Sequence, residues 1–361
     1  MKSNYNLIAL SFLFLITLLF AGTAKILFSE KVKKPEYEKM EKAVELAAEW
    51  FALVHKEKLM KGLVNQEWRS LKYGGLMGKE YSDITTTLGS AESKQTAINP
   101  QFAALTYSWM IENGIDSNST VGVNISGSFP SIAIAVLAAI QVLGAEAVLI
   151  SSLGASSFGA NDPEFTWIDI EELLRRNSNL HFKSILLTPG GINDNGGGLQ
   201  PEGIIQLKNA ALRCGSELYF PKNLVEASEI RINTFTRFGI DLLINIGGNH
   251  PALGNCSHAW QIPNGVIPNS FSCRHNERSF LFHFIENNIP VIHYLNVKEI
   301  ASRNGLPITP LTVFNKPESI YYRSSLNKLP ILIGVIILFV GMLFVSRKIK
   351  FFSKSKSEIN V

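Results

Sequence analysis

The feature that most constrains the fold of this 361-residue chain is a regular alternation of strand-like and helix-like segments that begins at Val121. The stretch 121–140 opens with alternating β-branched residues, which favour a strand, and continues as an Ala/Ile/Leu run typical of a buried helix. Further strand-like segments, each followed by a helix-like one, lie at 146–151, 183–188, 217–220, 240–246 and 290–294. This order predicts an α/β fold with a mainly parallel, Rossmann-like sheet and helices on both faces.

Loops rich in Gly, Ser, Asn and Asp follow several of the predicted strands. In open α/β sheets the ligand crevice lies outside the carboxyl ends of the strands, so we expect these loops to form one site. A hydroxyl-rich run at 81–96 precedes the first strand and contains Lys94. The candidate binding residues are Thr86, Ser90, Lys94, Ser126, Gly127, Ser128, Asn161, Asp162, Gly190, Gly191, Asn249 and His250.

The turn at 126–131 has the features of an anion site. Pro130 suits the first turn of a helix because it has no N–H group to leave unpaired. The free N–H groups of that turn and the helix dipole both favour negative charge, and Ser128 adds a hydroxyl. Lys94 with its neighbouring hydroxyls suits a carboxylate or a phosphate. The alternatives are a purely structural turn at Ser128 and a solvated loop at 81–96.

A catalytic interpretation of the same corner is also open. Ser128 lies at a strand-turn-helix junction, as does the nucleophile of α/β-hydrolases, but the pattern Ser-Gly-Ser-Phe-Pro is not Gly-x-Ser-x-Gly. His250 is the best-placed candidate base, and Asp162 or Asp194 is available to orient it. The catalytic candidates under this hypothesis are Ser128, His250 and Asp194.

Other site classes have less support. An acidic metal site of Asp162, Glu164, Asp194 and His250 has no diagnostic spacing, so no metal is predicted. Neither of the glycine-rich dinucleotide and P-loop fingerprints follows a strand, and no cofactor is predicted. The net charge of +4 derives largely from Lys and Arg clusters beside two apolar segments, which does not describe a nucleic-acid-binding face.

The two apolar segments, 7–24 and 329–346, are each about long enough to cross a bilayer. Five basic residues follow the second segment, which predicts a cytoplasmic C-terminus by the positive-inside rule and places the region between the segments outside the cytoplasm. Lys25, Lys31, Lys33 and Lys34 after the first segment oppose this orientation. A cleavage-like site at 22–24 leaves a removed signal peptide as an alternative.

The expected organisation follows from these segments and from an amphipathic helix after the first of them. That helix is expected either to pack on its own domain or to contact a membrane partner. The predicted regions are a cytoplasmic N-terminus (1–6), a transmembrane helix or uncleaved signal anchor (7–28), a juxtamembrane amphipathic helix (29–75), an extracytoplasmic α/β domain (76–325), a transmembrane helix (329–346) and a basic cytoplasmic tail (347–361). Of the three cysteines, Cys214 is expected to be buried, and Cys256 and Cys273 are candidates for a disulfide.

Five blocks carry a resemblance that exceeds a single motif: TTTLGS at 85–90, SGSFP at 126–130, SSLGASSFGANDPEFTW at 151–167, TPGGI at 188–192 and GGNHP at 247–251. Over roughly 81–294, and in its apolar ends, the chain resembles the bacterial poly-gamma-glutamate system protein family. The resemblance implies a membrane protein that works beside the membrane subunits of the poly-gamma-glutamate synthase or exporter, with the polymer itself as a further partner. Together with the two apolar segments, it predicts a two-span protein of the bacterial plasma membrane, in contact with the lipid bilayer. It implies no catalytic residues.

The leading functional hypothesis is therefore an accessory component of poly-gamma-glutamate synthesis or export whose α/β domain binds the carboxylate-rich polymer. The rival hypothesis is a hydrolase or transferase that uses Ser128 and His250 to trim, release or attach the polymer. A third is a scaffold that holds the synthase together through the 35–60 helix. Whether the protein is an enzyme is left open at this point.

Overall fold

The computed structural model describes residues 11–12, 14–20, 23, 28–255, 261–271, 279–308 and 315–357, and the chain divides into two compact units. The larger unit is Pro35–Tyr321. The smaller one combines the two ends of the chain, Met1–Lys34 and Tyr322–Val361. The candidate site lies entirely in the larger unit.

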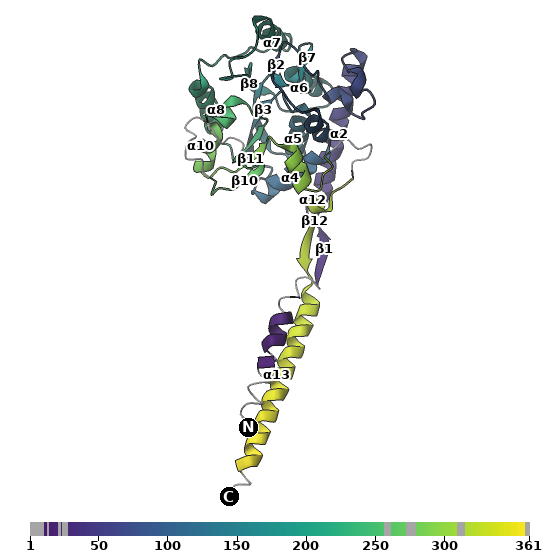
Figure 1. The fold of residues 1–361 in the computed structure, drawn as a ribbon, viewed down its shortest axis with the longest axis vertical. Coiled ribbons are helices and arrows are strands. Elements are labelled where there is room, and N and C mark those ends of the chain that lie inside the picture. Colours follow the sequence, from purple (N-terminus) through teal and green to yellow (C-terminus); the bar gives the residue numbers. More distant parts are fainter. Residues whose placement is uncertain are drawn as a thin grey trace. The chain divides into compact units, whose positions relative to one another are not determined.

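A six-stranded sheet forms the centre of the larger unit (Figure 1). Its strand order is β10-β11-β9-β3-β4-β8. Its strands are β3 (Thr120–Ser126), β4 (Glu146–Ser152), β8 (Ser184–Thr188), β9 (Leu242–Ile246), β10 (Gly265–Ile267) and β11 (Val291–Tyr294). Neighbouring strands are parallel except at the edge, where β10 runs antiparallel to β11. The sheet is therefore mixed. The strand predicted at 217–220 makes only an isolated bridge, Leu187 to Leu218, because the chain there touches β8 without running along it.

Helices and short strands complete the larger unit. The helices are α2 (Tyr37–Met60), α3 (Ala91–Ala97), α4 (Gln101–Glu112), α5 (Pro130–Leu143), α6 (Trp167–Asn177), α7 (Pro201–Arg213), α8 (Leu224–Phe238), α9 (His250–Leu253), α10 (Phe280–Glu286), α11 (Val297–Arg303) and α12 (Glu318–Tyr321), with 3₁₀ turns η1 (Gln66–Trp68) and η2 (Gly74–Leu76). Two further pairs of short strands are β2 (Thr85–Thr87) with β5 (Ala155–Ser156), and β6 (Asn161–Asp162) with β7 (Phe165–Thr166).

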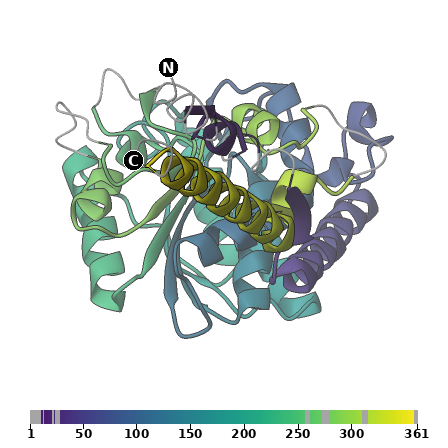
Figure 2. The same ribbon diagram turned by 90° about the horizontal axis from the view of Figure 1, so that it is seen from below.

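Helices lie on both sides of the sheet (Figure 2). Because successive side chains of a strand point to opposite faces, each helical layer packs against every second residue of a strand. Val148 and Ile150 of β4 join a buried cluster with Phe235 of α8 and Phe284 of α10. On β3, a Cβ added at Gly122 would lie 2.7 Å from Ile240 and 3.0 Å from Phe235, so a glycine lets the α8 layer approach this face. The intervening residues of each strand face the other layer, where α5 packs on β3 and β4.

Helix α2 belongs to this second layer. Its buried stripe includes Met40, Ala47, Trp50, Phe51 and Val54, all fully inaccessible to solvent. The helix packs against α4 and α5, and α5 in turn packs on β3 and β4 of the sheet. The amphipathic pattern is therefore satisfied inside the larger unit, as expected for a helix that packs on its own domain.

The smaller unit contains an unpredicted strand pair and a long helix. Strand β1 (Ser29–Lys33) runs antiparallel to β12 (Tyr322–Leu326), and α13 covers Lys328–Ser357. Residues 29–33 are therefore extended and are not part of an amphipathic helix.

The predicted flanking transmembrane helices are wrong. Within the part of the chain that the structure describes, no helix combines the length and the apolar character needed to cross a bilayer. A spanning helix needs about 20 consecutive, predominantly apolar residues. The plasma-membrane location, the two-span topology, the extracytoplasmic domain and the cytoplasmic C-terminus were inferred from these segments and are corrected with them. Residues 7–10, 13, 21–22 and 24–27 of the first segment lie outside the described residues.

The cysteine predictions have separate outcomes. Cys214 caps α7 and is a half-buried free thiol, with Sγ 3.7 Å from Oδ1 of Asp169. Burial, aided by the neighbouring carboxylate, raises the pKa of this thiol to about 12. Cys256 and Cys273 lie outside the described residues.

Candidate functional site

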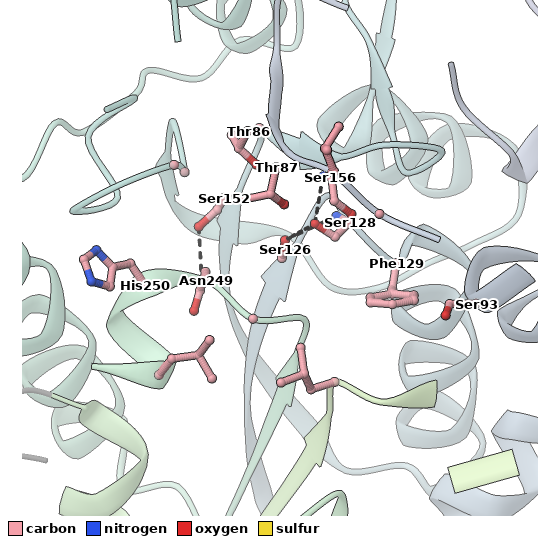
Figure 3. A pocket seen from close by; sticks show the side chains of 18 of the residues that line it. Thr86, Thr87, Ser93, Ser126, Ser128, Phe129, Ser152, Ser156, Asn249 and His250 are labelled. Atoms are coloured by element: carbon pink, nitrogen blue, oxygen red, sulfur yellow. Dashed lines mark hydrogen bonds between the residues drawn. The ribbon is translucent and has the colours of Figure 1, made fainter. Parts of the chain in front are cut away.

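A cavity of about 450 Å³ lies at the carboxyl ends of the central strands. Its lining comes from the β2–α3 segment, from the loops after β3, β4, β8 and β9, and from Leu295 after β11. Figure 3 shows hydroxyl side chains from several of these loops converging, with His250 and Asn249 on one side and Phe129 and Ser93 on the other. The volume falls within the range of about 300–1,000 Å³ that is usual for small-molecule sites.

Most of the candidate residues chosen from the sequence line this cavity. They are Thr86, Ser90, Lys94, Ser126, Ser128, Gly190, Gly191, Asn249 and His250. They come from strand ends that are far apart in the sequence and meet because parallel strands direct their carboxyl ends to the same edge of the sheet.

The turn after β3 delivers Ser126 and Ser128. Pro130 is the first residue of α5, and the helix ends at Gly144 with φ of 84°. The hydroxyl of Ser126 donates to Oγ of Ser128 over 3.0 Å and accepts from the backbone N–H of Ser128 over 3.2 Å. Oγ of Ser128 also accepts from the backbone N–H of Ser156 over 3.0 Å. Ser128 therefore ties the β3 turn to the loop after β4 (Figure 3).

Lys94 brings a buried amine to the cavity from the last turn of α3. Its side chain is 4% exposed, and Nζ lies 2.5 Å from the carbonyl oxygen of Ser128 and 2.9 Å from Oγ of Ser156. Nζ also lies 3.4 Å from the centre of the Phe129 ring. No carboxylate among the described residues pairs with it, and burial lowers the pKa of Lys94 to about 7.

The loop after β8 forms another wall. Gly190 and Gly191 have φ of 78° and 75°, and a Cβ at Gly191 would lie 2.7 Å from the carbonyl oxygen of Gly197. Side chains would therefore be strained at both positions and would clash at the second. Glycine allows the backbone itself to line the cavity here.

An ion pair supports the base of the cavity. Oδ2 of Asp194 lies 2.7 Å from Nη2 of Arg231, and both side chains are fully buried. Ser152, which lines the cavity, donates to Oδ1 of Asp194 over 2.9 Å. Arg231 also donates from Nε to Oδ1 of Asn124 over 2.8 Å. Asp194 is therefore held by the core under the cavity and does not itself line it.

The three candidate catalytic residues do not form a triad in the described structure. His250 accepts a hydrogen bond at Nδ1 from the backbone N–H of Asn193 over 2.9 Å, so its neutral ring carries the proton on Nε2 and has no free lone pair for a serine. No hydrogen bond between described residues joins His250 to Ser128 or to Asp194. Partial burial lowers the pKa of His250, although Asp194 acts in the opposite direction.

Three of the candidate residues lie away from the cavity. Gly127 bonds through its backbone to Ser152 and Ala160. Asn161 is fully buried, and its amide holds the backbone of Lys79 through Oδ1 and Nδ2, each over 2.9 Å. Asp162 lines a second cavity of about 520 Å³, where it pairs with Nζ of Lys79 at 3.2 Å.

The acidic residues are therefore separated. Asp162 and Asp194 have different cationic partners, and no group of three or more His, Cys, Asp or Glu side chains suited to one metal ion occurs among the residues that the structure describes.

Several lining residues were missed by the sequence analysis. The most important are Phe129, Ser152 and Ser156. Ser152 is the last residue of β4 and Ser156 lies in β5, and the position of this serine-rich segment at the end of a predicted strand was the available signal. The pairing of Ser156 with Lys94, 62 positions away in the sequence, had no sequence signal.

Comparisons of the chain with protein-family models, with curated proteins and with solved structures found no match.

Proposed function

We propose that the Pro35–Tyr321 unit binds an acidic, carboxylate-rich chain in the 450 Å³ cavity, and that this chain is poly-gamma-glutamate. The observation that carries the proposal is the charge balance of the cavity. Its lining includes Lys94 and His250 but no Asp or Glu side chain. The polar contacts of Lys94 are with neutral oxygen atoms, so its positive charge has no compensating partner among the described residues.

The donors around the cavity suit carboxylates. Hydroxyl groups come from Thr86, Thr87, Ser90, Ser93, Ser126, Ser128, Ser152 and Ser156. The first turn of α5, a 14-residue helix, begins at the Ser128 corner and supplies the positive end of a helix dipole. Hydroxyls and N–H groups that surround an uncompensated amine favour an anion over a neutral ligand.

The choice of polymer rests on the sequence resemblance described above. Poly-gamma-glutamate carries one α-carboxylate on each unit and an amide in each link, which agrees with a cavity that offers both cationic and hydroxyl donors. Under this proposal the protein is an accessory component of the synthesis or export of the polymer and works with the subunits that make it.

The test is a calorimetric titration of the full chain with γ-linked glutamate oligomers, with α-linked oligomers and inorganic polyphosphate as comparisons. We expect saturable binding that prefers the γ-linked oligomer and weakens as salt is added. Lys94→Met should weaken binding about tenfold or more, a loss of about 1.4 kcal/mol. Lys298→Met removes the same charge from outside the cavity lining and should leave binding unchanged. Absence of saturation, or equal binding of every polyanion, would contradict the proposal.

A further inference from the structure

A serine hydroxyl and a buried amine lie in contact on the wall of the cavity. Oγ of Ser156 is 2.9 Å from Nζ of Lys94, both residues line the cavity, and Ser156 is 7% exposed. We propose that Ser156 and Lys94 form a serine–lysine catalytic dyad that hydrolyses an amide link of the bound chain. The choice of substrate rests on the proposed function, whereas the dyad rests on the geometry alone.

The surroundings of Lys94 suit a base. An uncharged amine has two N–H groups and one lone pair. One N–H group can donate to the carbonyl oxygen of Ser128 and the other can face the Phe129 ring, which leaves the lone pair for the hydroxyl of Ser156. The pKa of Lys94, lowered to about 7 by burial, means that a substantial fraction of the amine is uncharged at neutral pH. Serine–lysine pairs of this kind are a known variant of the serine nucleophile with its base.

The other charged groups near this pair leave it intact. His250 is the other titratable side chain of the lining, and its Nδ1 atom is occupied by the N–H group of Asn193. On α3 itself, Glu92 pairs with Lys298 of α11 at 2.6 Å. Neither group has a hydrogen bond or an ion pair to Lys94 among the described residues.

The backbone of Gly89 approaches the Ser156 hydroxyl closely. A Cβ added at Gly89 would lie 3.1 Å from Oγ of Ser156 and 2.9 Å from the carbonyl oxygen of Ser157. Only glycine fits here without pressing on the hydroxyl, so the Gly89 backbone lies directly beside the nucleophile. The backbone N–H groups of Leu88 and Gly89, in the cavity lining, make no hydrogen bond within the described part of the chain. They are available as donors to an oxyanion.

The reaction has two balanced steps. Oγ of Ser156 bonds to the amide carbonyl carbon while Lys94 takes the hydroxyl proton. The C–N bond then breaks, and Lys94 gives the proton to the leaving amine. This leaves an ester on Ser156. A water molecule attacks that ester, Lys94 takes its proton, and the proton returns to Oγ of Ser156 as the C–O bond breaks. The products are a carboxylic acid and an amine, and no other reactant is needed.

The first test uses a fluorophosphonate probe on the full chain, because an activated serine displaces its fluoride. Peptide mass spectrometry then locates the adduct. We expect it on Ser156, absent in Ser156→Ala, and formed about 100-fold or more slowly in Lys94→Met and Lys94→Arg. Arginine keeps the positive charge but does not give up its proton, so this variant separates a base from an anion-binding charge. Ser319→Ala and Lys298→Met, both outside the cavity lining, should react as the unaltered chain does.

Three results would overturn the dyad: no adduct on Ser156, an adduct on Ser128 instead, or Lys94 variants that are labelled as fast as the unaltered chain. The position of the adduct in the unaltered chain tests the assignment of Ser156 even if a variant fails to fold. Thermal melts followed by circular dichroism identify a variant that does not fold.

A second test separates the dyad from its substrate. The unaltered chain should shorten γ-linked glutamate oligomers and release new α-amines, and Ser156→Ala should bind them without cutting. Labelling of Ser156 without oligomer binding would support the catalytic dyad and contradict poly-gamma-glutamate as its substrate. Oligomer binding without labelling or cutting would support poly-gamma-glutamate as the ligand and contradict the catalytic dyad.

Discussion

Asp194 and Arg231 form an ion pair in the core of the larger unit, with Oδ2 of Asp194 2.7 Å from Nη2 of Arg231 and neither side chain exposed. Ser152 connects this pair to the cavity, since its hydroxyl donates to Oδ1 of Asp194. Two charges buried in this way are tolerated only because each neutralises the other and neutral donors or acceptors satisfy their remaining atoms. The pair therefore fixes the loop after β8 against α8.

Breaking this pair should be costly. Asp194→Asn keeps a residue that tolerates the left-handed backbone found here (φ 60°) but leaves the Arg231 charge unpaired. We expect a loss of about 3–5 kcal/mol in the free energy of unfolding, measured with urea, and a similar loss for Arg231→Met. The double variant should lose clearly less than the sum, because no unpaired charge remains. Single variants within 1 kcal/mol of the unaltered chain would show that the pair is not buried as described.

Lys94 should make stability depend on pH in a defined direction. Burial lowers its pKa to about 7 in the native state from the ordinary lysine value of 10.5, so between these values the unfolded chain binds a proton that the native chain does not. The free energy of unfolding of the unaltered chain, relative to that of Lys94→Met, should therefore increase as the pH rises through about 7 and towards 10. Chemical unfolding of both proteins from pH 6 to 9 measures the difference, and the other buried lysine, Lys58, is common to both. A constant or falling difference would contradict the shift.

Gly89→Ala tests the space beside Ser156. The added methyl group would press on Oγ of Ser156 and on the carbonyl oxygen of Ser157, so the neighbours must move. We expect fluorophosphonate labelling of Ser156 to slow about tenfold, with a stability loss of about 1–3 kcal/mol from overpacking. Gly341→Ala, whose added methyl group would meet no atom within 4 Å, is the matched control. Unchanged labelling in a folded Gly89→Ala protein would mean that substrates approach from another side.

Trp50→Ala tests whether α2 is part of the core. Trp50 is fully buried in α2, a helix that packs against α4 and α5, and its removal should cost about 3–5 kcal/mol through lost burial and a residual cavity. Leu59→Ala on the same helix removes a side chain that is 43% exposed and should cost much less. Similar small losses from both substitutions would indicate a helix that stands apart from the domain.

The position of the site could be anticipated from the loops, because parallel strands place their carboxyl ends together. The same argument did not identify which loop residues line the cavity. Asn161 and Asp162 have suitable side chains, yet Asn161 is used to hold Lys79 and Asp162 faces a second cavity. Side-chain direction in a loop depends on contacts with distant segments, and these have no local pattern.

What the sequence determined by itself was local: the alternation of strands and helices, the helix start at Pro130, and the apolar stripe of α2. Each depends on residues within a few positions of one another, whose periodicity sets which face is buried. Only the tertiary structure decided that Ser156 contacts Lys94, that Asp194 pairs with Arg231 and not with His250, and that no described helix can cross a membrane. These outcomes depend on burial and on contacts between residues far apart in the chain, where the energy of a charge or hydroxyl is set by its folded neighbours.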